Sequence, residues 1–307
     1  LTVICGVSGS GKSTLINGTL LPAIDSKINR KSLKKQYPYK SIQGYENIDK
    51  IININQKPIG RSPRSNPITY INVFTLIREL YSNLSQSKIR GYSLGRFSFN
   101  VKEGNCTQCD GNGFTLVQMK LLPDMESPCL SCMGQRFDKE TLEIKYNNKN
   151  IYDVLEMSVN EAVVFFKNIP KIRNKLKSLK DVGMGYIKLG QASTKLSGGE
   201  AQRVKLAAEL AKNSTGNTLY LLDEPTTGLH FHDIKILMKS INLLADKGNT
   251  VIIIEHNMDI IKDADHIIEL GPKGGKEGGK MIFSGSVHEI LNNKSSQTSF
   301  FLKKEIS

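Results

Sequence analysis

The sequence predicts an α/β fold: a nucleotide-binding domain with a mixed or parallel sheet, interrupted by a mostly helical insertion that carries a small zinc module. Three observations support it. A glycine-rich loop follows an apolar segment at the start of the chain, two later apolar segments end in acidic residues or histidine, and two Cys-x-x-Cys pairs lie between. Helical patterns at 150–157, 159–167 and 172–179 fill the region after the cysteines. The expected divisions are 1–60 and 196–307 for the ATP-binding domain and 61–195 for the insertion, with zinc at about 96–140.

The composition excludes a disordered chain and favours a polyanionic partner. Of 307 residues, 39% are hydrophobic and 23% charged, which is enough to build a core. The net charge is +13, and residues 1–150 carry +10 of it. No apolar run approaches the roughly 18 residues that span a bilayer, and the first residues do not look like a signal peptide. We therefore expect a cytoplasmic protein without a membrane partner.

The first motif, Gly6 to Ser13, fits the phosphate-binding pattern G-x-x-x-x-G-K-[ST] between an expected strand and an expected helix. Its glycines let backbone N–H groups converge on phosphate oxygens, and the helix start adds favourable partial charge. Lys12 is expected to reach the β- and γ-phosphates of ATP, and Ser13 to bind Mg²⁺. A flexible turn before an ordinary helix is the alternative. The predicted nucleotide contacts here are Gly6, Ser8, Gly9, Gly11, Lys12, Ser13 and Thr14.

Two further apolar segments end in residues that suit the same site. Residues 218–222 precede Asp223 and Glu224, and residues 250–254 precede Glu255 and His256. At the end of a parallel strand beside the P-loop, Asp223 would hold Mg²⁺ and Glu224 would deprotonate the attacking water. His256 would hydrogen-bond the γ-phosphate. A solvated strand end and an ordinary surface histidine are the alternatives.

The segment Leu196-Ser197-Gly198-Gly199-Glu200 opens an expected helix that runs to about residue 212. Ser197 and Glu200 have the spacing of a capping box, which by itself explains both residues. Capping does not explain two adjacent glycines, because glycine destabilises helices. A phosphate that approaches the backbone at the helix start explains them.

Cys106, Cys109, Cys129 and Cys132 form two Cys-x-x-Cys pairs separated by 19 residues, the spacing of a tetrahedral zinc site. Four thiolates close the coordination shell, so this zinc would be structural. A redox role for either pair is the alternative. Cys5 is expected to be a small buried residue.

Basic and aromatic residues alternate around these cysteines, a pattern that suits contact with a nucleic-acid backbone and stacking on exposed bases. Phe97 and Phe99 are more simply explained as core of the module. The basic side chains are expected to contact DNA rather than to form a merely solvated face. They are Arg90, Arg96, Lys102, Lys120, Arg136 and Lys139.

Together these motifs resemble an ABC-type ATPase: a Walker A loop at 6–13, Leu-Ser-Gly-Gly-Glu at 196–200, a Walker B strand ending at Glu224, and His256. The resemblance implies that Ser197, Gly198 and Gly199 complete a site for ATP held by another ABC module. It also implies that Gln56 is the glutamine that couples ATP to the second subdomain.

A zinc module between Walker A and the signature narrows the resemblance to the C-terminal half of the UvrA family. The supporting segments are 61–67, 95–100, 185–190 and 196–206, besides the four cysteines. The resemblance implies an ATP-hydrolysing protein of nucleotide excision repair that binds damaged double-stranded DNA and loads UvrB. The alternatives are a UvrA-like ABC ATPase with a resistance or regulatory role, and a non-catalytic, zinc-stabilised DNA-binding fragment.

Overall fold

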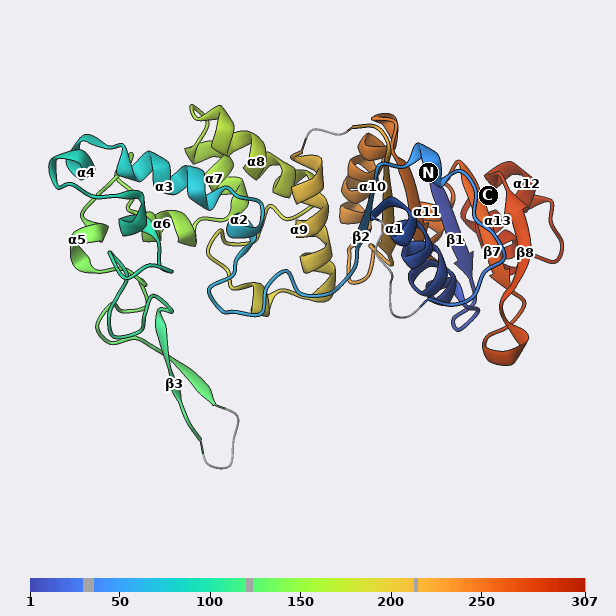
Figure 1. The fold of residues 1–307 in the computed structure, drawn as a ribbon, viewed down its shortest axis with the longest axis horizontal. Helices are drawn as coiled ribbons and strands as arrows, with labels where there is room; N and C mark the ends of the chain where they lie inside the picture. Colours follow the sequence, from blue (N-terminus) through green and yellow to red (C-terminus); the bar gives the residue numbers. More distant parts are fainter. Residues whose placement is uncertain (30–35, 120–123, 213–214, 307) are drawn as a thin grey trace. The chain divides into compact units, whose positions relative to one another are not determined.

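The computed structural model describes residues 1–29, 36–119, 124–212 and 215–306, and it divides into two compact units. The first unit combines Leu1–Gln56 with Lys212–Ser307, and the second is Lys57–Ala211. The chain therefore leaves the first unit after Gln56 and returns to it at Lys212 (Figure 1).

The first unit contains a sheet with the strand order β2-β5-β6-β1-β7-β8. The strands are β1 (Thr2–Gly6), β2 (Lys50–Ile54), β5 (Thr218–Asp223), β6 (Thr250–Ile254), β7 (His266–Gly271) and β8 (Lys280–Gly285). All neighbours pair in parallel except β7 and β8, which are antiparallel. The mixed, mostly parallel sheet of the predicted α/β fold is confirmed.

Helices cover the central strands of this sheet, which explains why those strands are apolar throughout. The segment after the P-loop begins as the π-helix η1 (Thr14–Leu20) and continues as α1 (Leu21–Asn29). Ile16 and Ile24 from this segment pack into one core cluster with strand residues such as Leu221. The remaining helices of this unit are η2 (Tyr45–Asn47), α10 (Phe231–Asp246), α11 (Met258–Ile261), η5 (Gly275–Glu277), α12 (Val287–Leu291) and α13 (Gln297–Ile306).

The second unit is mostly helical, as the patterns after the cysteines predict. Its helices are α2 (Pro67–Tyr70), α3 (Phe74–Ser82), α4 (Ser85–Ile89), η3 (Leu94–Phe97), α5 (Lys139–Leu142), α6 (Ile151–Glu156), α7 (Val159–Phe165), α8 (Pro170–Asp181), η4 (Ser193–Lys195) and α9 (Gly198–Leu210). Side-chain caps begin several of them. Asn150 and Ser158, for example, each form a reciprocal capping box with the residue three positions later.

The boundary between the units differs from the expected one at residue 196. Helix α9 packs against α8 and α2 of the second unit, and it buries residues such as Val204 and Leu206. Because α9 supplies part of that unit's core, the division falls after Ala211 rather than before the signature segment. The other division falls after Gln56, a few residues before the expected one at 60.

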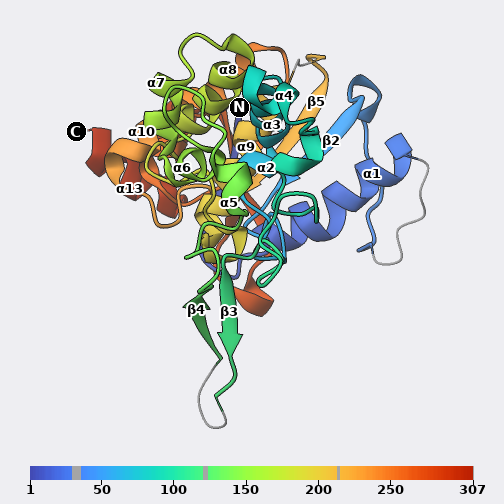
Figure 2. The ribbon, with the colours of Figure 1, turned by 90° about the vertical axis from the view of Figure 1, so that its left-hand side faces the viewer.

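A two-stranded hairpin extends from the second unit. Strand β3 (Phe114–Val117) pairs antiparallel with β4 (Met125–Pro128). The first Cys-x-x-Cys pair precedes β3 and the second follows β4, so the cysteines lie at the base of the hairpin. Figure 2 shows the two strands projecting away from the helices of this unit.

Among the described residues, no helix is both long and apolar enough to cross a membrane.

Candidate nucleotide and metal sites

Three of the sequence-predicted motifs meet at the carboxyl edge of adjacent strands. β6 lies between β1 and β5, and its Ile254 pairs with Ile4 on one side and Asp223 on the other. The P-loop, the Asp223–Glu224 pair and His256 therefore leave the sheet side by side. In open parallel sheets, ligands bind outside this edge. The Walker B strand is next to β6, however, and not next to the strand of the P-loop.

The P-loop has the backbone geometry that its glycines predict. Gly6, Gly9 and Gly11 have φ of 126°, 75° and 98°, values that strain other residues. A Cβ on Gly6 would also lie 1.9 Å from the carbonyl oxygen of Leu270 on the neighbouring strand. Lys12 Nζ donates to the carbonyl oxygens of Gly6 and Val7, at 2.8 and 2.9 Å, so its ammonium group lies over the loop.

Glu224 and His256 face one another at the strand edge. Glu224 Oε1 lies 4.0 Å from His256 Nδ1, and the two side chains are 44% and 68% exposed. Glu224 has φ of +45°, and its N–H donates to the carbonyl of Ile254 at 3.0 Å. A carboxylate in this position can accept a proton from a water molecule in front of the strands.

Two asparagines that the sequence analysis missed connect to the Walker B aspartate. Asn17 Nδ2, on η1, donates to Asp223 Oδ2 at 3.1 Å, and Asn53 Nδ2, on β2, donates to Asn17 Oδ1 at 3.3 Å. They join the helix after the P-loop to the strand that carries the expected Mg²⁺ ligand. The spacing of Asn17, one helical turn after Ser13, is the signal in the sequence that could have indicated its role beside Asp223.

Glu255 was also missed as a functional residue. It directly precedes His256, yet its side chain is completely buried. Its carboxylate accepts hydrogen bonds from the loops that follow β5 and β6. A charged residue at the end of an apolar strand is usually solvated, so the sequence offers little reason to expect this burial.

The signature segment belongs to the second unit, and Gln56 is the last residue before the chain enters that unit. Ser197 caps α9: its Oγ accepts from the N–H of Glu200 at 3.2 Å, and Glu200 Oε2 accepts from the N–H of Ser197 at 2.8 Å. The capping box is thus present, and Gly198 and Gly199 form the first turn of α9 within the second unit. Gln56 is exposed and is the last residue of the first unit's opening segment.

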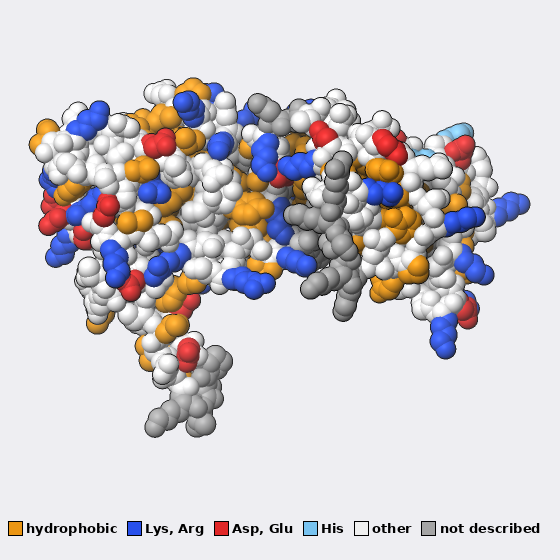
Figure 3. Space-filling model, viewed as in Figure 1, with side chains coloured by type: hydrophobic (Ala, Val, Ile, Leu, Met, Phe, Trp, Pro, Cys, Tyr) orange, Lys and Arg blue, Asp and Glu red, His pale blue; other side chains and the backbone are white. Residues whose placement is uncertain are grey.

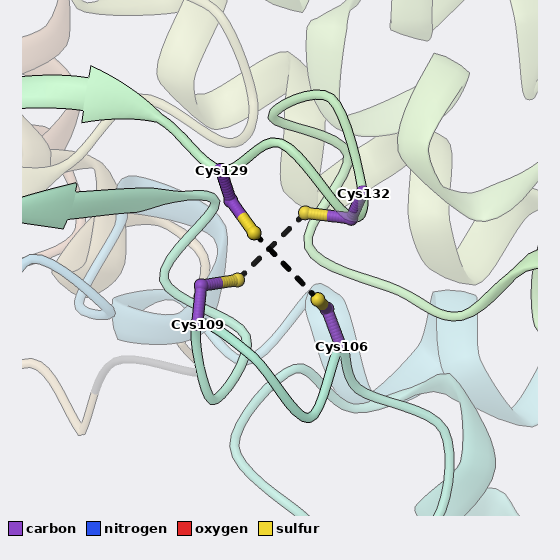
Figure 4. A group of neighbouring side chains, drawn as sticks. All are labelled: Cys106, Cys109, Cys129 and Cys132. Atoms are coloured by element: carbon purple, nitrogen blue, oxygen red, sulfur yellow. Dashed lines mark hydrogen bonds between the residues drawn. The ribbon is translucent and has the colours of Figure 1, made fainter.

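The four predicted metal ligands converge. All four sulfur atoms lie within 4.8 Å of one another, and the Cys106–Cys129 and Cys109–Cys132 sulfurs are 3.8 and 3.7 Å apart (Figure 4). Zinc–sulfur bonds of about 2.3 Å in a tetrahedron put the sulfurs about 3.8 Å apart. Disulfide sulfurs would be about 2 Å apart. The donor set and its spacing therefore fit a tetrahedral metal ion.

Local backbone geometry sets up the cluster. Gly111 and Gly134 have φ of 75° and 84°, so a tight turn follows each Cys-x-x-Cys pair. Hydrogen bonds from the backbone N–H groups of Cys109 and Gln108 outweigh burial and lower the pKa of the Cys106 thiol to about 7, whereas burial raises the pKa of Cys132 to about 12. Cys5 is buried in the first unit as expected, and burial raises its pKa to about 11.

The aromatic residues near the cluster are core residues, as expected. Phe97 and Phe99 are fully buried, and Phe99 stacks on Phe74 with ring centroids 5.0 Å apart. Figure 3 shows hydrophobic side chains exposed on the hairpin. They include Leu116, Val117 and Met125, which are 61%, 42% and 57% exposed.

Around the cluster, the three arginines expected to contact DNA have partners within the protein, whereas two lysines are exposed beside it. Arg96 is only 17% exposed and binds Asp138 and Glu140, and Arg136 lies over the Phe99 ring, so both side chains have partners within the module. Their charges hold the module together. Arg90 pairs with Glu143 on the surface.

Lys102 and Lys139 are exposed and line one hollow of about 370 Å³ together with Cys106 and Cys132. Lys120 lies outside the described residues.

The fold, together with the arrangement of the P-loop, Asp223–Glu224 and His256, resembles an ABC-type ATPase domain. The ABC transporter family matches residues 127–227, which include the signature and the Walker B strand. Nearly the whole chain, 99% of it, is 58% identical to UvrABC system protein A of Clostridium acetobutylicum and 59% identical to that of Clostridium tetani. The resemblance to UvrA that the motifs indicate is confirmed.

A solved structure supports the same relationship. The crystal structure of UvrA2 from Deinococcus radiodurans matches the whole chain with a TM-score of 0.90 and 42% identity. The chain spans about a third of the length of these relatives: 32% of each clostridial protein and 37% of UvrA2.

Proposed function

We propose that this chain is an ATP-hydrolysing, DNA-binding module that recognises damaged DNA and loads UvrB in nucleotide excision repair. The observation that carries the proposal is the set of three adjacent strand ends, where the P-loop, Asp223–Glu224 and His256 meet. The similarity to UvrABC system protein A over 99% of the chain supplies the biological context.

In the proposed ATP site, each motif has one task. The P-loop amides and Lys12 bind the phosphates, while Ser13 and Asp223 hold Mg²⁺, which neutralises charge on the phosphates. Asn17 orients Asp223 through the 3.1 Å hydrogen bond. Glu224 orients the attacking water and takes its proton, and His256 donates a hydrogen bond to the γ-phosphate. Gln56 couples the nucleotide to the second unit.

The signature acts in trans in this proposal. Ser197, Gly198 and Gly199 begin a 13-residue helix whose first backbone N–H groups can bind a phosphate. They would complete an ATP site on another ABC module, either a further module of a longer protein or a second copy.

We assign structural zinc to the four cysteines. Four thiolates leave no open coordination position, so the ion would stabilise the base of the hairpin and take no part in chemistry. With its base fixed by the ion, the hairpin would present the exposed aliphatic side chains of β3 and β4 in a fixed position. Those side chains and Lys102 and Lys139 are the surface we propose for duplex DNA, with lysines on the phosphates and the hairpin at distorted base steps.

The experiment that tests the ATPase is the Glu224→Gln variant. Loss of the proton acceptor should reduce ATP turnover at least about a hundredfold while ATP affinity changes less than about threefold. Glu305→Gln, which changes an exposed carboxylate on α13, is the matched control and should hydrolyse ATP like the parent. Turnover by Glu224→Gln at the parent rate would remove Glu224 from its role.

A further inference from the structure

We propose that Glu255 is a positioning residue for ATP hydrolysis: it holds the loop of Glu224 and the loop of His256 in one arrangement. The inference rests on the proposed ATPase function, because it concerns the geometry of that same site. Glu255 is 0% exposed, so it cannot touch nucleotide or water itself. It acts only through the groups that it binds.

Each carboxylate oxygen of Glu255 holds a different loop. Oε1 accepts from the backbone N–H of Thr226 at 3.1 Å and from the Thr226 hydroxyl. Oε2 accepts from the backbone N–H groups of His256 and Asn257, at 2.8 and 3.1 Å. Four donors therefore converge on one buried carboxylate, which compensates for its removal from water. The backbone of Glu255 is fixed as well, because its N–H donates to Ile4 on the strand of the P-loop.

The two loops need this support because their functional side chains, Glu224 and His256, are exposed and have few contacts among the described residues that would hold them in place. The side chains of Glu224 and His256 are 44% and 68% exposed, and Glu224 Oε1 lies 4.0 Å from His256 Nδ1. Glu224 also has φ of +45°, a region that a non-glycine residue keeps only when its surroundings fix it. Two threonines that follow it in the loop fix it: the backbone N–H and the side-chain Oγ1 of Thr227 both donate to the Glu224 carbonyl, and Thr226 is bound to Glu255.

A glutamine at position 255 separates this role from simple space filling. Gln keeps the size of Glu, but its amide has one acceptor oxygen and one NH₂ group that donates. The glutamine can therefore accept from only one of the two donor pairs, either Thr226 or His256 and Asn257. At the other pair its NH₂ group faces N–H or O–H donors and cannot accept from them. One loop is released, and a displacement of about 1 Å at a reacting group can cost about a hundredfold in rate.

The test compares steady-state ATP hydrolysis by the parent chain, Glu255→Gln and Glu269→Gln. Glu269 is the matched control, since it is another buried carboxylate of the same sheet, on β7, whose Oε1 accepts from Thr298 rather than from the catalytic loops. For Glu255→Gln we expect kcat to fall at least about tenfold while KM for ATP stays within about threefold. For Glu269→Gln we expect kcat within about threefold of the parent.

Thr226 variants give a second route that leaves the buried carboxylate in place. Thr226→Ala removes one of the four donors and should lower kcat, whereas Thr226→Ser keeps the hydroxyl and should retain parent turnover. The effects of Thr226→Ala and Glu255→Gln should be less than additive, because both act through one contact. Fully additive effects would contradict the proposed coupling.

Amide hydrogen exchange at residues 226, 256 and 257 measures how well the two loops are held, and it does not depend on ATP turnover. Faster exchange in Glu255→Gln than in Glu269→Gln supports the proposal. Parent-like kcat and exchange in Glu255→Gln, or an equal loss of kcat in both variants, overturns it. If the parent chain does not hydrolyse ATP, or if Glu224→Gln turns over like the parent, the proposed ATPase function fails instead, and the exchange rates alone decide whether Glu255 holds both loops.

Discussion

Asp223 and Glu224 are adjacent in sequence but have different neighbours. Asp223 receives the amide of Asn17 from the helix that follows the P-loop, whereas Glu224 turns through a positive φ toward His256. One carboxylate is therefore fixed toward the phosphate-binding helix and the other is exposed in front of the strands. This division fits a metal ligand beside a proton acceptor.

The contact between Asn17 and Asp223 gives a prediction for the metal requirement. Asn17→Ala removes the donor that orients Asp223, so the Mg²⁺ concentration for half-maximal ATP hydrolysis should rise about tenfold. Asn29→Ala, on the following helix segment, removes an exposed amide that binds only Asp25 in the described contacts and is the control. A Mg²⁺ titration of ATPase activity measures both, and equal midpoints would rule out this role for Asn17.

Glu200 in the signature gives a prediction for pH. Partial burial acts to raise the pKa of Glu200, but hydrogen bonds from the Tyr186 hydroxyl and from Ser197 outweigh it and hold the pKa below its ordinary value. A lowered pKa in the folded state means that the stabilisation is present above the unfolded pKa of about 4.3 and is lost as the pH falls. The free energy of unfolding of Glu200→Gln should therefore be lower than the parent's at pH 7 and converge with it toward pH 3. Denaturant unfolding at several pH values measures this, and a constant difference would contradict it.

At the scale of elements, the hairpin and its four cysteines form one structural piece. The sulfurs meet where β3 and β4 begin and end, so an ion there ties both strands to the body of the second unit. Two paired strands of four residues each have little stability of their own.

The element-level prediction concerns metal removal. The parent should bind one zinc ion per chain, and Cys109→Ser should lose it and unfold about 10 °C lower, because structural zinc contributes several kcal/mol or more to folding. Cys5→Ala is the control, since Cys5 is buried in the other unit and should leave the zinc content unchanged. Metal analysis and thermal unfolding are the measurements. Full zinc content in Cys109→Ser would remove that residue from the ligand set.

Local patterns predicted the features that lie within a few residues of one another. The P-loop turns, the signature cap and the cysteine pairs were predicted because their chemistry depends on spacing along the chain. The placement of β6 between β1 and β5, the burial of Glu255 and the membership of α9 in the second unit were not, because each depends on packing between distant segments. The partners of Arg96 and Arg136 within the module were not predicted for the same reason, since composition does not show which side chains meet.

At the scale of the whole molecule, the charge of +13 is consistent with the proposed polyanions ATP and DNA. Lys102 and Lys139 are exposed beside the cysteine cluster. If they contact phosphates, duplex affinity should fall at least about tenfold between 50 and 200 mM salt, and Lys102→Ala/Lys139→Ala should reduce the salt slope by about two. A control with Lys171→Ala and Lys177→Ala, on α8, should keep the parent slope.

The most direct test of the proposed function is one binding measurement. Fluorescence anisotropy compares the chain's affinity for a duplex with one bulky lesion and for the intact duplex of the same sequence, with Mg²⁺ and either ATP or ADP. A protein that reads DNA deformability should bind the lesion duplex more tightly, by about tenfold, in at least one nucleotide state. Equal affinity for both duplexes in every nucleotide state would contradict the proposal that this chain recognises damage.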